Sequence, residues 1–332
     1  MNQLHDKAQG ALLGLALGDA LGTTLEFQPK DSYPPLTDLV GGGPFNLAPG
    51  QWTDDTAMAL CLAQSLVETG RNDIVDQMQR YLRWFREGEN ACTGECIDIG
   101  HTVKQALLRF EADGNPVAGI DAEWTAGNGS LMRIAPIALF FHRADLGLAI
   151  SGALISSITT HGEQRAIEAC ELMTYFLHRL LNSRGQPCKA ALLFELDERL
   201  DKVRQNWHPA IQAIANGAYR HKPRSAIHGS GYVVHSLEAA LWSFFHSNSF
   251  AEGALLAANL GEDADTTAAI YGQLAGAYYG RAALPQAWLE KLAWRDSISA
   301  LARMLCDLAQ TAHGRGPGGL AKGSVADHAL AG

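Results

Sequence analysis

The sequence contains no long apolar run: among its 332 residues, no stretch approaches the roughly 18 consecutive apolar residues that a membrane span requires. Residues 11–17 resemble the core of a signal peptide, but no basic excess precedes them and no cleavage site of small residues is evident. Cysteine is scarce as well, and the six cysteines are scattered, which argues against a disulfide framework. We therefore expect a cytoplasmic protein without a membrane span.

An excess of positive charge is also missing. Lys and Arg number 26 against 35 Asp and Glu, for a formal net charge of −9, which argues against a nucleic-acid-binding surface but leaves room for a local phosphate pocket. The sequence has no Walker-type Gly-Lys-Ser/Thr and no Gly-x-Gly-x-x-Gly after a strand. Nothing therefore supports nucleoside triphosphate chemistry or a Rossmann dinucleotide site.

Period-two alternation of apolar and polar residues is absent, so the chain shows no convincing strands. Apolar residues recur instead at helical spacing, and 47% hydrophobic residues are ample for a large core. We predict an all-α fold, a single compact bundle of roughly a dozen helices over residues 1–312, with a flexible tail over residues 313–332. The predicted helices include residues 57–69, 73–87, 145–158, 163–182, 188–203, 208–217, 233–246, 250–258, 266–280, 285–293 and 295–312.

Two of these helices carry glycine at every fourth position. Each glycine weakens a helix by about 1 kcal/mol relative to alanine, so a stripe of them needs a compensating reason, and close approach of another backbone is the natural one. We predict two buried central helices that pack at a short axial distance, near each other. The stripes are Gly10, Gly14, Gly18 and Gly22, and Gly272, Gly276 and Gly280.

Two stretches concentrate carboxylates just before a helix: Trp52-Thr53-Asp54-Asp55-Thr56 and Asp263-Ala264-Asp265-Thr266-Thr267. Helix capping is one explanation, because Thr and Asp oxygens accept bonds from the free N–H groups of the first turn. One cap, however, needs one oxygen, and paired like charges repel one another. Four aspartates and their threonines also form the all-oxygen ligand set that Mg²⁺, Mn²⁺ or Ca²⁺ prefers. We predict a split metal site in which two cations neutralise four carboxylates.

Other polar stretches have both a functional and an ordinary interpretation. The loop at residues 127–130, Gly-Asn-Gly-Ser, precedes apolar helical sequence with Arg133, so its N–H groups could face an anion or simply form a turn. His161 lies at a break between helices, where it could face a ligand or cap a helix. Glu26 stands at the start of a long Pro-rich connection, and Tyr232 could lie against a sugar or in the core.

Five motifs, in order over about residues 6 to 310, together resemble the ADP-ribosylglycohydrolase family, and within it the bacterial glycohydrolases that reactivate dinitrogen reductase. The motifs are the glycine stripe of residues 10–22, Leu25-Glu26-Phe27, Trp52-Thr53-Asp54-Asp55-Thr56, Gly127-Asn128-Gly129-Ser130-Leu131-Met132-Arg133, and Asp263-Ala264-Asp265-Thr266-Thr267 with Gly272-Gln273-Leu274-Ala275-Gly276.

The resemblance implies a compact orthogonal helical bundle with two Mg²⁺ or Mn²⁺ ions at the floor of a cleft. It assigns the metal ligands as Thr53, Asp54, Asp55, Asp263, Asp265 and Thr266. The proton acceptor would be one of Asp54, Asp55, Asp263 and Glu26. The residues that contact the substrate would be Asn128, Gly129, Ser130, Met132, His161 and Tyr232.

The reaction that this family implies is hydrolysis of the bond between C1 of a ribose in ADP-ribose and an acceptor side chain of a modified protein, releasing ADP-ribose. Arginine is the preferred linkage because of the similarity to the bacterial enzymes. Serine-linked or small-molecule conjugates are alternatives within the same chemistry. A different class of function is an immunity-type binding protein that neutralises an ADP-ribosyltransferase; inhibition that survives loss of the metal ligands would point to it.

Overall fold

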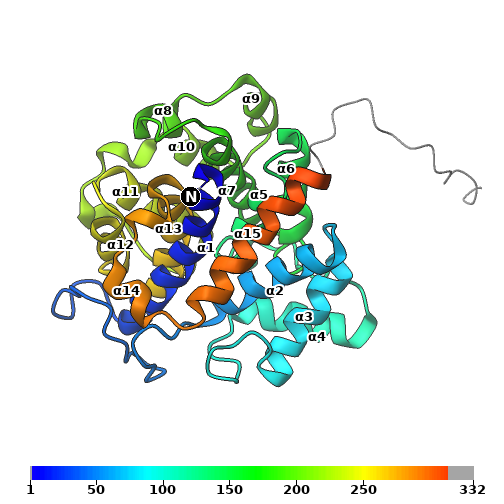
Figure 1. Ribbon diagram of the computed structural model, residues 1–332, viewed down its shortest axis with the longest axis horizontal. Helices are drawn as coiled ribbons and strands as arrows, with labels where there is room; N and C mark the ends of the chain where they lie inside the picture. Colours follow the sequence, from blue (N-terminus) through cyan, green and yellow to red (C-terminus); the bar gives the residue numbers. More distant parts are fainter. Residues whose placement is uncertain (1, 313–332) are drawn as a thin grey trace, which may run out of the picture.

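The computed structural model describes residues 2–312 of the chain, and within them it contains α- and 3₁₀-helices but no sheet, only three isolated β-bridges. The predicted all-α fold is therefore confirmed (Figure 1). The α-helices are α1 (Gln3–Gly22), α2 (Asp54–Thr69), α3 (Ile74–Glu87), α4 (His101–Asp113), α5 (Ala135–Phe140), α6 (Leu146–Ser157), α7 (Gln164–Asn182), α8 (Lys189–Phe194), α9 (Glu198–Arg204), α10 (Pro209–Ala215), α11 (Val233–Phe245), α12 (Phe250–Ala258), α13 (Ala264–Tyr279), α14 (Gln286–Lys291) and α15 (Arg295–Ala312).

The single helix predicted over residues 188–203 is wrong, because the structure has two short helices there, α8 and α9. The break has a local cause: the Asp197 carboxylate accepts hydrogen bonds from the backbone N–H groups of Arg199 and Leu200 and so starts a new helix. Several short helices of this kind raise the number above the predicted dozen. The tail predicted over residues 313–332 lies outside the described residues.

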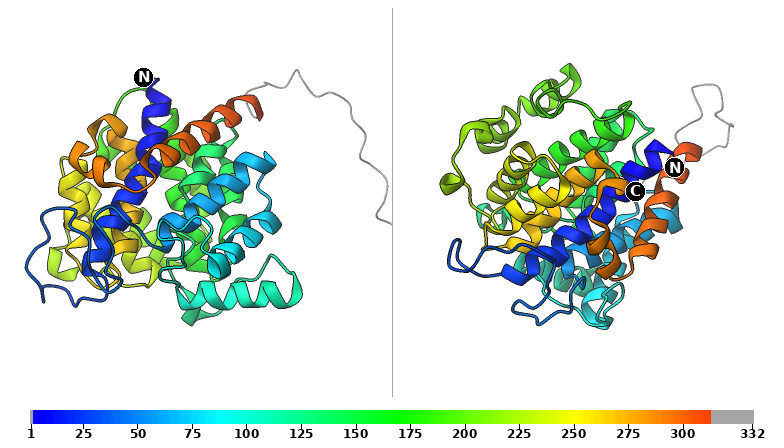
Figure 2. Two further views of the ribbon diagram at one scale, coloured as in Figure 1. Left: turned by 60° about the horizontal axis from the view of Figure 1, so that its bottom comes forward. Right: turned by 60° about the vertical axis from the view of Figure 1, so that its left-hand side comes forward.

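The two glycine-striped helices, α1 and α13, pack directly on each other. Helix α1, dark blue in Figures 1 and 2, runs through the middle of the bundle, and its residues are buried from Lys7 to Gly22. A Cβ atom added to Gly14 would lie 2.3 Å from the carbonyl oxygen of Gly272, and one added to Gly272 would lie 2.0 Å from the carbonyl oxygen of Gly14. The predicted close packing of two buried helices is confirmed.

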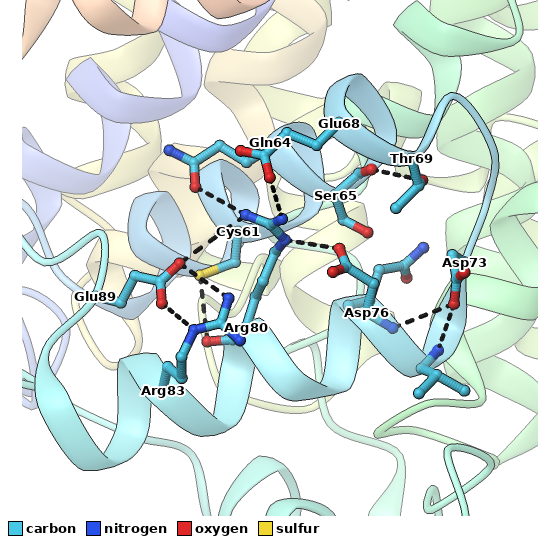
Figure 3. Close-up of polar contacts among 12 residues, drawn as sticks. Cys61, Gln64, Ser65, Glu68, Thr69, Asp73, Asp76, Arg80, Arg83 and Glu89 are labelled. Atoms are coloured by element: carbon cyan, nitrogen blue, oxygen red, sulfur yellow. Dashed lines mark hydrogen bonds and ion pairs between the residues drawn. The ribbon is translucent and has the colours of Figure 1, made fainter.

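Helix α2 is held from its outer side by α3 through a polar cluster around Arg80 (Figure 3). The guanidinium of Arg80 donates to Glu68 of α2 at 2.6 Å and to Asp76 of α3 at 2.7 Å, and its side chain is only 8% exposed. On its inner side α2 contacts α1, α13 and α15. These contacts fix the position of the first turn of α2, which carries Asp54 and Asp55.

Candidate active site and metal centre

The N-termini of α2 and α13 meet beside a cavity of about 600 Å³. This places the two Asp-rich stretches, separated by about 200 residues, at one site, as the split-site prediction requires. Eight residues singled out from the sequence line the cavity: Glu26, Asp54, Asn128, Gly129, Met132, His161, Asp263 and Thr266. Asp98 also lines it.

The N-terminus of α2 is capped by a residue of another helix, Asp19 of α1. One Asp19 oxygen accepts the backbone N–H of Thr53 at 2.9 Å and its hydroxyl at 2.8 Å; the other accepts the N–H of Thr56 at 2.9 Å and its hydroxyl at 2.6 Å. Thr53, the N-cap residue, makes no side-chain cap bond of its own. The carboxylates of Asp54 and Asp55 are therefore not used as caps.

Helix α13 is capped in the same indirect way, by Glu26. The Glu26 carboxylate accepts the backbone N–H of Ala264 at 2.8 Å and that of Asp265 at 3.4 Å. Asp263, the N-cap residue, makes no side-chain cap bond. Capping therefore does not explain the paired aspartates, since Asp19 and Glu26 supply the caps of the two helices. Among the four aspartates, Asp265 alone accepts a first-turn N–H within the described residues, that of Thr266 at 2.7 Å.

Within residues 2–312, two groups of carboxylates have oxygens within 4.8 Å of one another: Asp19, Asp55 and Asp265 form one, and Glu26, Asp263 and Asp265 form the other. Asp265 belongs to both. The Thr53 hydroxyl oxygen lies 3.3 Å from oxygens of Asp55 and of Asp265, which joins the two Asp-rich stretches.

The electrostatics of this cluster suit cations. Burial raises the pKa of Asp54, Asp55 and Asp265 well above the usual value, and the neighbouring carboxylates raise it further. One oxygen of Asp55 is buried without any hydrogen-bond partner. Such a concentration of desolvated oxygens is unfavourable in an ionised protein alone and favourable around hard divalent cations, so the residues present fit metal binding.

The glycine loop of residues 127–130 forms another wall of the cavity. The Asn128 amide donates to the Asp263 carboxylate at 2.7 Å and thereby ties the loop to the acidic cluster. Behind the loop lies His161: a Cβ atom added to Gly129 would come within 2.9 Å of the His161 ring. Only glycine therefore lets the loop backbone lie against the imidazole, and it leaves the loop amides beside the cavity.

Two of the predicted substrate contacts, Ser130 and Tyr232, do not line the cavity. Ser130 is buried and its hydroxyl accepts a hydrogen bond from Ser157 at 2.9 Å, away from the cavity lining. The Tyr232 hydroxyl accepts from Arg165 at 2.9 Å, and the tyrosine is not among the lining residues. Asp19 was missed as a site residue, although a lone acid inside an apolar glycine-striped helix was a signal for it.

Loss of the Asp19 carboxylate should destabilise the protein. In Asp19→Ala the two threonines keep buried N–H groups without acceptors, and we expect the free energy of unfolding to fall by about 2–4 kcal/mol. Urea unfolding with a chelator present would measure this without a metal contribution. Asp296→Ala, at an exposed acid paired with Arg295, is the matched control. Equal unfolding midpoints for the two variants would contradict the capping role.

The all-α bundle and the buried acidic cluster beside the cavity define a class of helical protein with a candidate metal centre. The family model described as ADP-ribosylglycohydrolase matches residues 1–315. The chain therefore belongs to the ADP-ribosylglycohydrolase family. It is thus a glycosyl hydrolase of a metal-dependent family.

Similar proteins agree with this assignment. The chain is 45% identical to the ADP-ribosylarginine hydrolase Tri1 of Pseudomonas putida, over 92% of this chain and 80% of the relative. It is 34% identical to the ADP-ribosyl-[dinitrogen reductase] glycohydrolase of Rhodospirillum rubrum, over 87% and 91%. A solved structure titled ADP-ribosylglycohydrolase-related protein complex superposes with a TM-score of 0.81 at 44% identity, covering 93% of this chain and all of that one. The resemblance inferred from the motifs is confirmed.

No helix within residues 2–312 is both long and apolar enough to cross a bilayer.

Proposed function

We propose that this protein removes ADP-ribose from arginine side chains of modified proteins, with two divalent cations, Mg²⁺ or Mn²⁺, in the acidic cluster. One observation carries the proposal: both Asp-bearing helix starts are capped by residues of other elements, and Asp54 and Asp263 lie at the wall of a cavity that also holds the glycine loop. The 45% identity to an ADP-ribosylarginine hydrolase supports the arginine linkage.

The ligands of the cations would be Thr53, Asp54, Asp55, Asp263, Asp265 and Thr266. Asp265 is central because its oxygens belong to both carboxylate groups. Asp19 supports the site from behind: all four of its hydrogen bonds go to Thr53 and Thr56, and these bonds orient the first turn of α2. When bound, divalent cations supply charge stabilisation and lower the pKa of a water molecule.

Cleavage at C1 of the ribose passes through an oxocarbenium-like state and needs a group that takes a proton from the attacking water. Among the candidates Glu26, Asp54, Asp55 and Asp263, three line the cavity, whereas Asp55 is fully buried behind it. We therefore favour Glu26, Asp54 or Asp263 as the proton acceptor. Each lies where a water molecule in the cavity can reach its carboxylate.

The glycine loop would hold the diphosphate of ADP-ribose. Its glycines keep the backbone close to the cavity, and backbone N–H groups in such a loop can donate to phosphate oxygens. Asn128 is already bonded to Asp263, so it would couple the phosphate-binding loop to the end of the cavity where the ribose reacts. Met132 and His161 complete this side.

The reaction and its linkage are tested by release of free ADP-ribose from arginine-linked and serine-linked modified peptides, each with Mg²⁺, with Mn²⁺ and with a chelator. We expect release from the arginine peptide to be at least about a hundredfold faster than from the serine peptide, and to stop with the chelator, since a site built for one leaving group leaves its polar groups unpaired with another. Faster release from the serine peptide would overturn the linkage. No release from either, together with inhibition of an ADP-ribosyltransferase, would overturn the hydrolase proposal.

A further inference from the structure

Behind the glycine loop lies a buried cation that the proposed reaction does not use. Arg133 has no exposed surface, and among residues 2–312 no carboxylate lies within ion-pair distance of it. Its guanidinium donates to the carbonyl oxygen of Gly129 at 2.7 Å and to the hydroxyl of Thr160 at 2.7 Å, and it lies over the ring of Tyr81. A buried positive charge without a counter-ion is costly unless it does something for the fold or for a ligand.

The Arg133 guanidinium determines which group donates in the hydrogen bond between Thr160 and His161. The Thr160 hydroxyl oxygen lies 2.9 Å from Nδ1 of His161. Because a guanidinium can only donate, Thr160 accepts from Arg133, and its single hydrogen is then free to donate to Nδ1. The opposite arrangement, in which Nδ1–H donates, would leave the fully buried Thr160 hydroxyl hydrogen without an acceptor. Nδ1 therefore accepts, and the proton of the neutral imidazole resides on Nε2.

Nε2 is the ring nitrogen on the side of the glycine loop. It lies 3.2 Å from the positions that Cβ atoms would take on Gly127 and on Gly129. His161 and these two glycines all line the cavity. The imidazole is also kept neutral, because burial and then the nearby Arg133 charge lower the pKa of His161 to about 3. What faces the loop is thus an uncharged N–H group that is oriented from behind.

We propose that Arg133 and Thr160 act as a relay that holds His161 in its Nε2–H form, so that the imidazole donates a hydrogen bond to an anionic oxygen of the bound ligand. This inference rests on the proposed function, in which that oxygen belongs to the diphosphate of ADP-ribose. Arg133 and Thr160 are positioning residues and His161 is the group that touches the ligand. The uncompensated guanidinium charge also favours an anion at the loop, where the low-dielectric surroundings weaken screening.

Thr160→Val tests the relay, because it removes the hydroxyl and keeps the shape of the side chain. Thr159→Val is the matched control: the Thr159 hydroxyl also accepts from Arg133, at 3.3 Å, but it has no bond to His161. Nitrogen-15 NMR of the imidazoles in the ligand-free protein reports the tautomer, with the His161 signal assigned by its loss in His161→Gln. The dissociation constant of ADP-ribose, measured by calorimetry with Mg²⁺, reports whether His161 Nε2–H donates to the ligand.

We expect Nε2–H in the wild-type protein and in Thr159→Val, and a mixture of tautomers in Thr160→Val. The dissociation constant of ADP-ribose should rise about tenfold in Thr160→Val, the effect of losing one well-oriented hydrogen bond to a charged group, and Thr160→Ser should restore it. In turnover the loss should appear in KM with kcat within about twofold, as expected when ground and transition states lose the same contact.

An Nδ1–H tautomer in the wild-type protein, or an unchanged tautomer in Thr160→Val, would overturn the relay. A changed tautomer with unchanged ADP-ribose affinity would overturn the role of Nε2–H as a ligand donor. The tautomer and the ADP-ribose affinity are both measured without turnover. A failed peptide-hydrolysis assay would therefore count against the proposed function, whereas the tautomer and the affinity test the role of Arg133 and Thr160 separately.

Discussion

Asp265→Ala is expected to abolish release of ADP-ribose, lowering kcat/KM by roughly 10³-fold or more, the scale of losing a group on which the catalytic site depends. The physical reason is that Asp265 is the one carboxylate shared by both acidic groups, and that the Thr53 hydroxyl of the other stretch lies 3.3 Å from it. Removing it weakens both cation positions at once. The measurement is steady-state hydrolysis of an arginine-linked peptide at saturating Mg²⁺ or Mn²⁺.

The fold should survive this change. Burial and the repulsion of neighbouring carboxylates raise the pKa of Asp265, and relief of that repulsion in Asp265→Ala offsets the loss of the hydrogen bond that Asp265 accepts from the N–H of Thr266 at 2.7 Å. Thermal unfolding with a chelator should therefore show no loss of stability. Asp296→Ala, at an exposed acid that belongs to neither carboxylate group, should keep wild-type rates. Activity of Asp265→Ala within tenfold of the wild type would refute the metal assignment.

Gly272→Ala is expected to lower the free energy of unfolding by about 2–4 kcal/mol, since inserting a methyl group into a packed core typically costs about 1–3 kcal/mol and this site is unusually tight. Its new Cβ would lie 2.0 Å from the carbonyl oxygen and 2.5 Å from the carbonyl carbon of Gly14. Both are backbone atoms of a central helix, so they cannot move aside cheaply. The gain of about 1 kcal/mol in helix propensity is too small to compensate.

Urea unfolding measures this loss, and Gly147→Ala is the matched control. Gly147 is an exposed residue in the first turn of α6, where a Cβ would meet only the end of the Asp145 side chain at 3.1 Å. We expect that control to keep its stability or to gain up to about 1 kcal/mol, because alanine favours a helix more than glycine does. Cation affinity should also fall in Gly272→Ala, because α1 carries Asp19 and α13 carries Asp265. Equal stabilities of the two variants would contradict the close packing of α1 and α13.

Much of this arrangement could be predicted from local patterns. Helical periodicity is a property of short windows, and it identified most of the long helices within a few residues, as for α13, predicted over 266–280 and found over Ala264–Tyr279. Where a side chain competes with the backbone the pattern failed, as at Asp197, which starts a new helix inside a continuous apolar pattern. The glycine stripes predicted close packing because glycine at regular helical spacing weakens a helix unless another backbone lies close against it.

The site could be predicted only in part. Paired aspartates beside threonines indicated oxygen ligands, and the structure brings both stretches to one cavity. Their alternative role as helix caps could not be rejected without knowing which acids supply the caps. Asp19 and Glu26 do so from positions 34 or more residues away along the chain. Such bonds join elements that are distant in sequence, and no window of sequence contains both partners.

The sequence by itself determined most of the long helical segments, that two of them must approach closely at glycine, and which oxygen-rich residues are available for cations, because each depends on residue type and short-range spacing. Only the tertiary structure decided which acids cap helices α2 and α13, and that the buried Arg133 acts on His161 through Thr160. The reason is physical: a carboxylate, a guanidinium or an imidazole acquires its role from the partners around it, and packing of distant helices chooses those partners.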